Sequence, residues 1–438
     1  MPRRARHKPL LVRLNNRLVG QLLKQSSGAI DFSYHRDWLD WSDAIPVSLS
    51  LPLREDTYRG EGVAAVFENL LPDSDGLRRR VAERVGANGI DAHSLLAAIG
   101  RDCVGALQFS DPDRPTDTDS TAIDGETVSE TEIQRMLLNL ARAPLGLDQD
   151  QDFRISIAGA QEKTALLWHN GRWLKPRGTT PTTHIFKTRI GHLPNGIDLS
   201  NSVENEFYCL KLAEAFGLPV NHAEIHQFGD TKALVIERFD RRWTADGRLL
   251  RLPQEDCCQA LSVPPTRKYQ NEGGPGMVEI LELLKGSDRP AEDQAQFLKS
   301  QILFWLIGAT DGHAKNFSIF LGPGGQFSLT PLYDILTAQP SLGSGQIRRN
   351  QMKLAMSVGE NRHYRIDEIS GRHFRQTARA AGLPDRLISS VIEDIEKRML
   401  TALIETANIL PSGFPGEIHT AISSGIKAGL RRLSDTRS

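Results

Sequence analysis

The chain has 438 residues and a formal net charge of −1 at pH 7. That length predicts two to three domains with room for buried cores, and the near-neutral charge excludes a strong overall attraction to nucleic acid. Four cysteines without C-x-x-C or paired spacing argue against a zinc site or a disulfide framework, so we expect buried thiols in a reducing cytoplasm.

Nothing in the sequence predicts export or a membrane span. The longest apolar run, residues 302–309, is far shorter than the roughly 20 residues that a spanning helix needs. The basic start of the chain leads only into the short apolar stretch PLLV, which is too short for the core of a signal peptide. We therefore expect a cytoplasmic protein without membrane contacts.

The N-terminal third of the chain predicts a module of mixed helix and sheet. Residues 11–14 and 17–20 alternate as the two strands of a hairpin. Residues 67–85 have the apolar spacing of a helix. Residues 111–130 are acidic and rich in turn formers, which predicts a surface loop or linker after this module.

A candidate phosphate loop follows. Residues 153–156 and 164–168 read as strands that enclose the small residues of IAGAQEK. Small residues allow backbone N–H groups to approach phosphates, but the stretch lacks the second glycine of a P-loop, so we reject a P-loop NTPase. A hairpin turn with incidental small residues is the alternative interpretation.

Next come a strand and a helix of the kind that follow such a loop in kinases. The apolar strand at residues 184–187 ends in Lys187, which matches the placement of the kinase lysine that pairs with α- and β-phosphates. Residues 201–216 predict a helix, and either Glu204 or Glu206 is a candidate partner for Lys187. A solvated helix face is the alternative for both glutamates.

Residues 233–239 predict an apolar strand that runs into charged residues. In kinase-like folds a segment in this position crosses between lobes and offers backbone groups to adenine. A plain core strand is the alternative. Its place in the chain order, between the strand lysine and the candidate catalytic loop, favours the kinase interpretation.

The stretch IGATDGHAKNFSIF carries the strongest chemical signal. Asp311 and Asn316 stand five positions apart, and Asp334 follows in PLYDIL. In protein kinases an Asp accepts the proton of the substrate hydroxyl, an Asn five residues later holds Mg²⁺ and a downstream Asp completes the metal site. The flanking residues differ from the His-Arg and Phe-Gly of ordinary protein kinases, which argues against an ordinary eukaryotic-type kinase. Turn residues and a surface carboxylate are the alternative interpretation.

The elements around this stretch are also predictable. Apolar residues recur at helical spacing over residues 298–309, and Gly312 is the expected break. Residues 317–321 and 326–330 predict a hairpin, whose open end would carry Asn316 and Asp334 close together.

Several segments resemble the HipA toxin kinases of bacterial toxin–antitoxin pairs. The likeness rests on ISIAGAQEKTALL, TPTTHIFK, ERFDRRW, RLPQEDCCQ, GATDGHAKNFS and LTPLYDI, and on the N-terminal LSLPL, FENLLPDS and IGRDCVGA. The resemblance implies a Ser/Thr protein kinase that uses ATP and Mg²⁺ and that phosphorylates glutamyl-tRNA synthetase, which arrests translation and growth.

The resemblance also implies roles by position. Asp311 would be catalytic, Asn316 and Asp334 would bind Mg²⁺, and Ser156 would be the site of an inhibitory autophosphorylation that expels the phosphate loop. The ATP-binding residues would be Ala158, Gly159, Ala160, Gln161, Glu162, Lys163, Lys187, Glu237, Arg238, Phe239, His313, Ala314, Lys315, Asn316, Tyr333 and Asp334.

Basic residues near the C-terminus fit a further implied property of the family. HipA proteins sit on operator DNA through a HipB antitoxin dimer, and their own DNA contacts come from this region. The candidates here are Arg375 and Arg379, which fall on a predicted helical segment. A solvated helix face is the alternative.

We therefore expect an α+β protein with an N-terminal α/β module and a bilobal protein-kinase-like core. The expected boundaries are 1–148 for the module, 149–240 for the small lobe and 241–438 for a mostly helical large lobe. Three other functions compete: a kinase of a small hydroxyl substrate, a pseudokinase corepressor and a plain interaction protein. The ordered motifs favour the toxin kinase.

Overall fold

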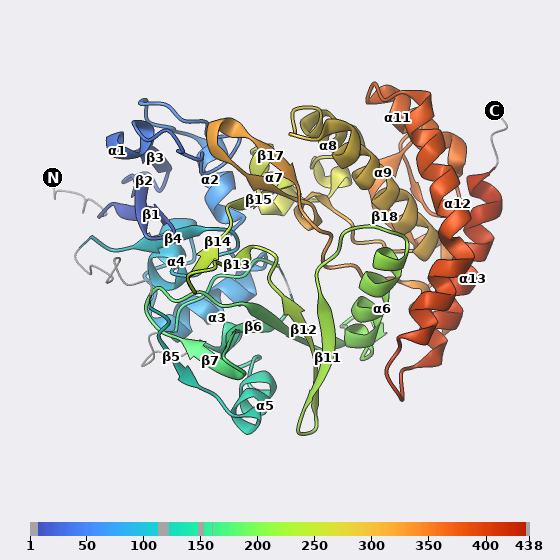
Figure 1. Ribbon diagram of the computed structural model, residues 1–438, viewed down its shortest axis with the longest axis horizontal. Helices are drawn as coiled ribbons and strands as arrows, with labels where there is room; N and C mark the ends of the chain where they lie inside the picture. Colours follow the sequence, from blue (N-terminus) through green and yellow to red (C-terminus); the bar gives the residue numbers. More distant parts are fainter. Residues whose placement is uncertain (1–7, 113–121, 148–152, 160, 435–438) are drawn as a thin grey trace. The chain divides into compact units, whose positions relative to one another are not determined.

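The computed structural model describes residues 8–112, 122–147, 153–159 and 161–434 (Figure 1). The chain divides into two compact units. Unit 1 comprises residues 1–188, 226–266 and 319–327, and unit 2 comprises residues 189–225, 267–318 and 328–438.

Unit 1 begins with an antiparallel sheet of order β3-β2-β1-β4. Its strands are β1 (Leu10–Leu14), β2 (Arg17–Lys24), β3 (Ile30–Tyr34) and β4 (Leu107–Ser110). The predicted hairpin is confirmed, because β1 and β2 pair through Asn15 and Asn16, which both have positive φ. Asparagine tolerates that conformation better than most residues do.

Four helices accompany this sheet, namely α1 (Arg36–Leu39), α2 (Glu61–Glu68), α3 (Asp75–Val85) and α4 (Ala92–Ile99). The prediction of one helix over residues 67–85 is wrong, because the segment between α2 and α3 is not helical. Pro72 lies there and Ser74 caps α3 by accepting a hydrogen bond from Leu77 N at 3.1 Å. A proline and an N-cap serine both favour a new helix start over continuation.

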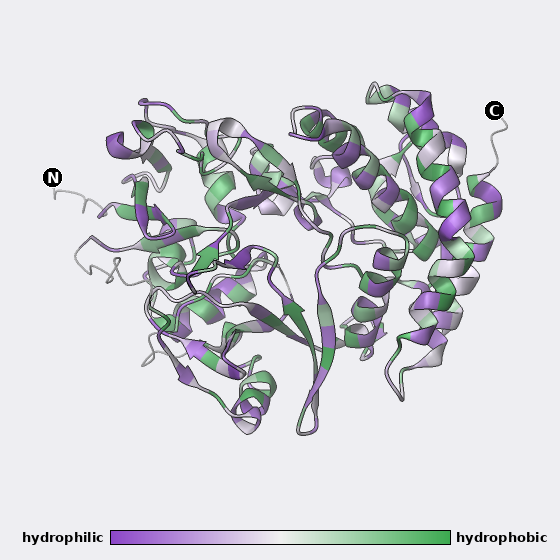
Figure 2. Cartoon of the chain, viewed as in Figure 1, coloured by the Kyte–Doolittle hydropathy of each residue, from purple (hydrophilic) through white to green (hydrophobic). Residues whose placement is uncertain are grey.

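A second sheet of six strands has the order β11-β12-β8-β6-β7-β5. Its strands are β5 (Gly125–Thr127), β6 (Lys163–His169), β7 (Arg172–Pro176), β8 (His184–Thr188), β11 (Ala223–Phe228) and β12 (Thr231–Glu237). Helix α5 (Glu130–Leu138) packs on it through Ile133 and Leu137, and Figure 2 shows β12 in hydrophobic colours.

Three strand predictions in this region can be compared with the structure. The strands predicted at 164–168, 184–187 and 233–239 are confirmed as β6, β8 and β12. The predicted strand at 153–156 is wrong, since only Ser156 makes an isolated bridge. The predicted linker at 111–130 is wrong in part, because β5 pairs with β7, while residues 113–121 lie outside the described residues.

The N-terminal sheet and the loop before β6 share one hydrophobic core. The same cluster contains Val12 and Phe109 of the first sheet, Phe67 of α2, and Ile155 and Ile157 beside the candidate phosphate loop. The start of the kinase-like segment is therefore built into the core of the N-terminal module.

A buried ionic network reinforces that junction. Asp102 Oδ1 lies 2.9 Å from Arg241 Nη2 and 3.0 Å from Arg251 Nε. Arg238 Nη2 lies 2.8 Å from Asp240 Oδ2. Burial opposes the ionisation of Asp102, but the nearby Arg241, Arg251 and Arg238 outweigh it and hold the pKa of this carboxyl well below its usual value.

Short elements complete unit 1 and the connection to unit 2. They are β13 (Arg241–Trp243), β14 (Leu249–Arg251), β15 (Gln254–Asp256), α7 (Cys257–Ala260), β16 (Ser318–Leu321) and β17 (Phe327–Leu329). The predicted hairpin at 317–330 is confirmed, because β16 and β17 are neighbours in a sheet of order β15-β16-β17.

Unit 2 is mostly helical. Its main helices are α6 (Ser202–Ala215), α8 (Met277–Leu284), α9 (Pro290–Ile307), α10 (Gln339–Gly343), α11 (Gly371–Ala380), α12 (Asp385–Asn408) and α13 (Gly416–Leu433). Helix α12 packs against α6 and α9, and α13 packs against α9 and α10. Its short strands are β9 (Gly191–His192), β10 (Asp198–Leu199), β18 (Lys353–Val358) and β19 (His363–Arg365).

Two helix predictions in unit 2 need correction at their ends. The predicted helix at 201–216 is confirmed as α6, but Asn201 makes no side-chain cap. The helix predicted over 298–309 ends at Gly308 rather than at Gly312. Gly308 has φ +70°, the left-handed conformation that favours glycine, and a Cβ there would lie 2.6 Å from Met352 Cε, so a larger residue would be strained and would displace the methionine.

The four cysteines are free and buried, as predicted. Within the described residues, no helix is both long and apolar enough to cross a membrane.

Candidate functional site

The loop after α9 brings Asp311 and Asn316 together. Asn316 lies in the 3₁₀ turn η4 (Ala314–Asn316) and is buried, while Asp311 is exposed. The Asn316 side-chain Nδ2 donates a hydrogen bond to the Asp311 carbonyl oxygen at 2.8 Å, and His313 N donates to the same oxygen at 2.8 Å. The loop backbone is thus held by the predicted metal ligand, and the Asp311 carboxylate remains accessible to a substrate.

Asp334 is held beside the same loop through its neighbour. The Tyr333 hydroxyl donates to the Lys315 carbonyl oxygen at 2.7 Å and lies 2.6 Å from Ser318 Oγ. Asp334 itself has φ +58°, an uncommon conformation for a residue other than glycine. Such strain persists only where the surroundings impose it, and it is frequent at functional positions.

The segment after Asp334 is anchored to two helices. Thr337 N donates to Asn205 Oδ1 of α6 at 3.0 Å, and Asn205 Nδ2 donates to the Thr337 carbonyl oxygen at 2.9 Å. The Thr337 hydroxyl donates to the carbonyl oxygen of Ile307, the last residue of α9. Helices α6 and α9 thereby anchor the segment that follows Asp334.

The residues present fit a magnesium ion. Because Asn316 Nδ2 is engaged by the Asp311 carbonyl, the amide oxygen Oδ1 is the atom left for a cation. Together with the Asp334 carboxylate it supplies hard oxygen ligands, which Mg²⁺ prefers alongside substrate phosphates. Among the described residues no cluster of three or more His, Cys, Asp or Glu side chains forms a metal site, so these two ligands would need phosphate oxygens and water to complete the shell.

The candidate phosphate loop in unit 1 contacts the segments around Leu70 and Asp102. The Ser156 hydroxyl donates to the Leu70 carbonyl oxygen at 2.8 Å, and Ser156 N donates to the Asp102 carbonyl oxygen at 3.0 Å. Gly159 forms a bridge with Pro72. Ser156 is 0% exposed, so its hydroxyl cannot accept a phosphate in this conformation.

Two lysines meet on one face of the sheet below this loop. Lys163 of β6 and Lys187 of β8 are direct cross-strand partners, and both are buried. Side chains opposite each other on antiparallel strands lie about 5 Å apart, and two cations in that relation repel unless anions stand near them. Lys163 Nζ also donates to the Ala158 carbonyl oxygen at 2.5 Å, which places the Lys163 ammonium against the candidate phosphate loop.

The other residues expected in the loop have separate contacts. Gln161 Nε2 donates to the Thr188 carbonyl oxygen at 2.8 Å. Glu162 pairs with Arg80 of α3 at 3.0 Å. Ala160 lies outside the described residues.

The expected adenine hinge lies at the end of β12. Arg238 N donates to the Thr183 carbonyl oxygen at 2.8 Å, and the Arg238 side chain is buried in the ionic network with Asp102 and Asp240. The Phe239 ring meets Phe320 edge to face, with 5.7 Å between centroids, and Glu237 is exposed. The Arg238 carbonyl oxygen accepts from Arg241 N at 3.2 Å, so the backbone N–H, the carbonyl and the guanidinium of Arg238 all have partners within the chain.

The remaining expected residues are placed as follows. His313, Ala314 and Lys315 are buried next to Asn316.

The two arginines proposed to contact DNA both lie on α11. Arg375 Nη1 donates to Ser389 Oγ at 2.8 Å, whereas exposed Arg379 pairs with Asp385 at 3.6 Å. The assignment of both to DNA stays a prediction, and Arg379 is the more accessible of the two.

One contact at the candidate catalytic residue could not be read from the sequence. The Tyr269 hydroxyl donates to Asp311 Oδ1 at 2.5 Å. The two residues are 42 positions apart, and Tyr269 carries no spacing or composition signal. The anchors of the phosphate loop, Leu70 and Asp102, do lie inside the quoted segments FENLLPDS and IGRDCVGA, although nothing in those patterns assigns the contacts.

The fold belongs to a known class. A solved structure of Shewanella oneidensis HipA, in complex with HipB and its operator DNA, matches with a TM-score of 0.80 and 25% identity. The match covers 97% of this chain and 98% of that one. The predicted α+β class with a kinase-like core is thereby confirmed.

Sequence comparisons agree. The family model described as "HipA-like C-terminal domain" matches residues 155–403, and "HipA N-terminal domain" matches residues 10–110. The protein named "Putative kinase Y4mE" from Sinorhizobium fredii is 34% identical, with 90% of this chain and 92% of the relative covered. The "Serine/threonine-protein kinase toxin HipA" of Shewanella oneidensis is 27% identical, with 92% and 90% covered. The chain belongs to the HipA family, as its sequence motifs predict.

Proposed function

We propose that this protein is an ATP-dependent Ser/Thr protein kinase that acts as the toxin of a toxin–antitoxin pair. The observation that carries the proposal is the joint arrangement of Asp311, Asn316 and Tyr333-Asp334 around one loop, with the Asp311 carboxylate exposed. Kinship with a Shewanella oneidensis protein named as a Ser/Thr kinase toxin supports the same reaction.

In the proposed reaction Asp311 accepts the proton of the acceptor hydroxyl as that oxygen bonds to the γ-phosphorus of ATP. The bond between the γ-phosphorus and the bridging oxygen breaks, and its electron pair leaves with ADP. Asn316 and Asp334 would hold Mg²⁺, which neutralises charge on the phosphates when bound. The paired Lys163 and Lys187 would bind phosphate oxygens, and the backbone at 237–239 would bind adenine.

Ser156 gives the proposal a means of self-inhibition. A phosphate there adds about −1.5 to −2 charge in a site that is fully buried and tied to Leu70, so the loop has to leave before or upon modification. The displaced loop no longer cradles ATP phosphates. We expect mass spectrometry to find phospho-Ser156 in wild-type protein and none in Asp311→Ala protein. An equal level of phospho-Ser156 in the two proteins would contradict self-phosphorylation.

We further propose a HipB-type antitoxin dimer and operator DNA as partners, with Arg379 and Arg375 near the DNA. The Shewanella oneidensis structure contains HipA, HipB and operator DNA, which supports this assembly. Glutamyl-tRNA synthetase is the proposed acceptor, on the strength of the family resemblance. Phosphorylation of that enzyme would arrest translation and growth.

The test is incubation of the purified protein with γ-labelled ATP, Mg²⁺ and host lysate. A labelled protein band, identified by mass spectrometry and absent with Asp311→Ala protein, is the expected result. Label confined to small molecules would favour a kinase of a small hydroxyl substrate. Absence of any label transfer, including to Ser156, would contradict the kinase and favour a pseudokinase.

A further inference from the structure

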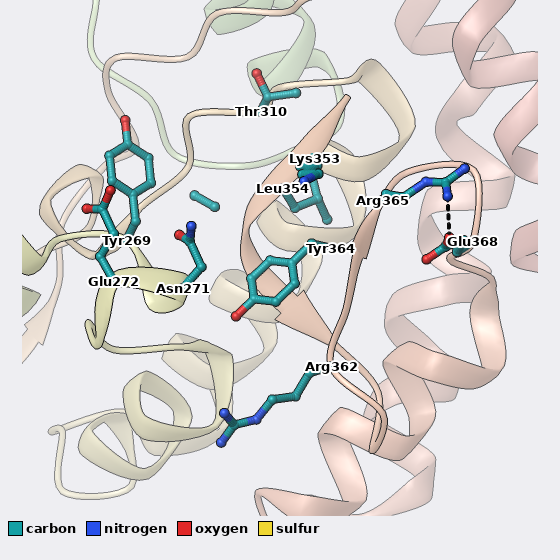
Figure 3. A pocket seen from close by; sticks show the side chains of 11 residues that line it. Tyr269, Asn271, Glu272, Thr310, Lys353, Leu354, Arg362, Tyr364, Arg365 and Glu368 are labelled. Atoms are coloured by element: carbon teal, nitrogen blue, oxygen red, sulfur yellow. Dashed lines mark ion pairs between the residues drawn. The ribbon is translucent and has the colours of Figure 1, made fainter. Parts of the chain in front are cut away.

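A pocket of about 500 Å³ opens within unit 2, and Figure 3 shows the side chains that line it. One wall is the 3₁₀ turn η3 (Gln270–Glu272) with its preceding residue Tyr269, and the facing wall is the β18–β19 hairpin. Thr310, the residue before Asp311, also lines it. The pocket is therefore continuous with the loop that carries the proton acceptor.

Tyr269 connects the pocket to the chemistry. Its hydroxyl donates to Asp311 Oδ1 at 2.5 Å, and its ring packs edge to face on His313 with 5.0 Å between centroids. An acceptor serine or threonine must present an O–H to that same carboxylate. Tyr269 thus makes the hydrogen bond that the acceptor hydroxyl would make, and the acceptor has to replace it.

The charges of the pocket indicate which kind of side chain an acceptor would present to it. Arg365 is neutralised by Asp367 at 2.7 Å and Glu368 at 2.8 Å. Lys353 and Arg362 of the hairpin wall are exposed and form no ion pair within the described parts of the chain, whereas Glu272 adds one carboxylate on the facing wall. The hairpin wall therefore presents two cations to an acceptor.

The uncharged lining suits an extended polypeptide. Figure 3 shows the Tyr364 ring between Asn271 and the hairpin. An aromatic face can cover aliphatic parts of a peptide, and the Asn271 amide offers both a donor and an acceptor to peptide groups.

We propose that this pocket binds the acceptor polypeptide, with an acidic side chain near the accepting residue paired to Lys353 and the accepting hydroxyl replacing Tyr269 on Asp311. The inference rests on the proposed kinase function and names its substrate-binding site. No covalent bond to Tyr269 forms or breaks. Its hydroxyl only loses the hydrogen bond to Asp311 before phosphoryl transfer.

The first test uses steady-state kinetics with the acceptor protein identified from the lysate. Lys353→Glu should raise KM for that acceptor about threefold to tenfold, because an exposed ion pair is lost and a like-charge repulsion is added. KM for ATP should not change, and Lys353→Arg should retain most of the acceptor affinity. Lys397→Glu, an equal charge change at an exposed position of α12, is the control and should behave as wild type.

The second test measures ATP hydrolysis to ADP and inorganic phosphate without any acceptor. Tyr269→Phe keeps the ring on His313 and removes the hydroxyl from Asp311, so water gains access to the carboxylate and hydrolysis should rise several-fold. A merely structural role of Tyr269 would leave hydrolysis unchanged or lower it.

The outcomes separate the two proposals. If wild-type protein labels an acceptor but Lys353→Glu leaves its KM unchanged and Tyr269→Phe does not raise hydrolysis, the pocket assignment is overturned and the kinase stands. If wild-type protein transfers no phosphate at all, the proposed function fails and this inference fails with it.

Discussion

At the scale of single residues, Asp334 combines an uncommon backbone conformation with a proposed role in metal binding. Two different substitutions distinguish these two properties. Its φ of +58° costs most side chains about 1–2 kcal/mol, whereas Asn adopts this conformation readily. Its carboxylate is the proposed Mg²⁺ ligand. Asp334→Asn should therefore remove the charge with little effect on the fold, and Asp334→Ala should affect both.

We expect both variants to raise the Kd of ATP at least about tenfold in the presence of Mg²⁺, measured by calorimetry. The thermal unfolding midpoint should fall clearly only for Asp334→Ala. A variant Asp334→Asn that binds Mg²⁺-ATP as tightly as wild type would show that Asp334 is not a metal ligand.

The spacing of Asp311, Asn316 and Asp334 predicts roles in phosphoryl transfer, since each residue type matches one step of that reaction. The structure brings Asp311 and Asn316 together on one loop, and their roles stay a prediction. The Tyr269 contact was not predictable, because a single tyrosine in a turn-rich stretch has no periodicity or motif to mark it. Likewise, the motif predicts that Arg238 lies in the hinge. The ion pairs of its side chain with Asp102 and Asp240 were not predictable, because these residues carry no motif that marks them as partners.

At the scale of elements, the phosphate loop depends on a glycine for two reasons. Gly159 has φ +106°, and a Cβ at this position would lie 2.7 Å from Lys163 Nζ. Gly171, in the turn between β6 and β7, has φ +74° but open space around it. Comparing the two positions separates backbone strain from displacement of Lys163.

Gly159→Ala should therefore raise the Kd of ATP about tenfold or more, because it displaces Lys163, which is proposed to bind the phosphates. Gly171→Ala should pay a similar backbone cost and leave ATP affinity unchanged. Equal effects of the two variants on ATP affinity would contradict a role of the loop in phosphate binding.

Element prediction succeeded where periodicity was strong and failed at breaks and loops. Helix α6 and strands β6, β8 and β12 follow from apolar spacing. The single helix predicted at 67–85 failed because its apolar pattern continues across Pro72 and Ser74, where local capping overrides it. The segment at 153–156 looks like a strand because Ile155 and Ile157 alternate with polar residues, but these side chains join the core of the N-terminal module instead of a ladder.

At the scale of the whole molecule, the ionic network around Asp102 ties the segment between α4 and β4 to the end of β12 and to β13 and β14 within unit 1. Removing one partner of a buried network leaves uncompensated charge, which costs about 3–5 kcal/mol. Asp102→Asn should lower the free energy of unfolding by that amount in denaturant titrations. Asp246→Asn, which breaks a 2.8 Å pair with Arg248 at an exposed turn, is the control and should cost less than about 1 kcal/mol.

The same carboxylate gives this stability a pH dependence. The folded pKa of Asp102 lies below its ordinary value of 3.8, because Arg241, Arg251 and Arg238 outweigh the effect of burial. Its contribution is therefore present above about pH 4 and is lost as the pH falls. Asp102→Asn protein should lose less stability than wild type on acidification. An equal loss of stability in both proteins would show that groups other than Asp102 cause the acid sensitivity.

The central claim is that Asp311 performs phosphoryl transfer, and it is tested most directly by measuring transfer and binding on the same variant. Asp311→Ala should reduce transfer from γ-labelled ATP to the acceptor protein and to Ser156 by about 10²-fold or more. It should leave the Kd of Mg²⁺-ATP within about threefold, which is less than 1 kcal/mol. Transfer by Asp311→Ala protein at the wild-type rate would contradict the account.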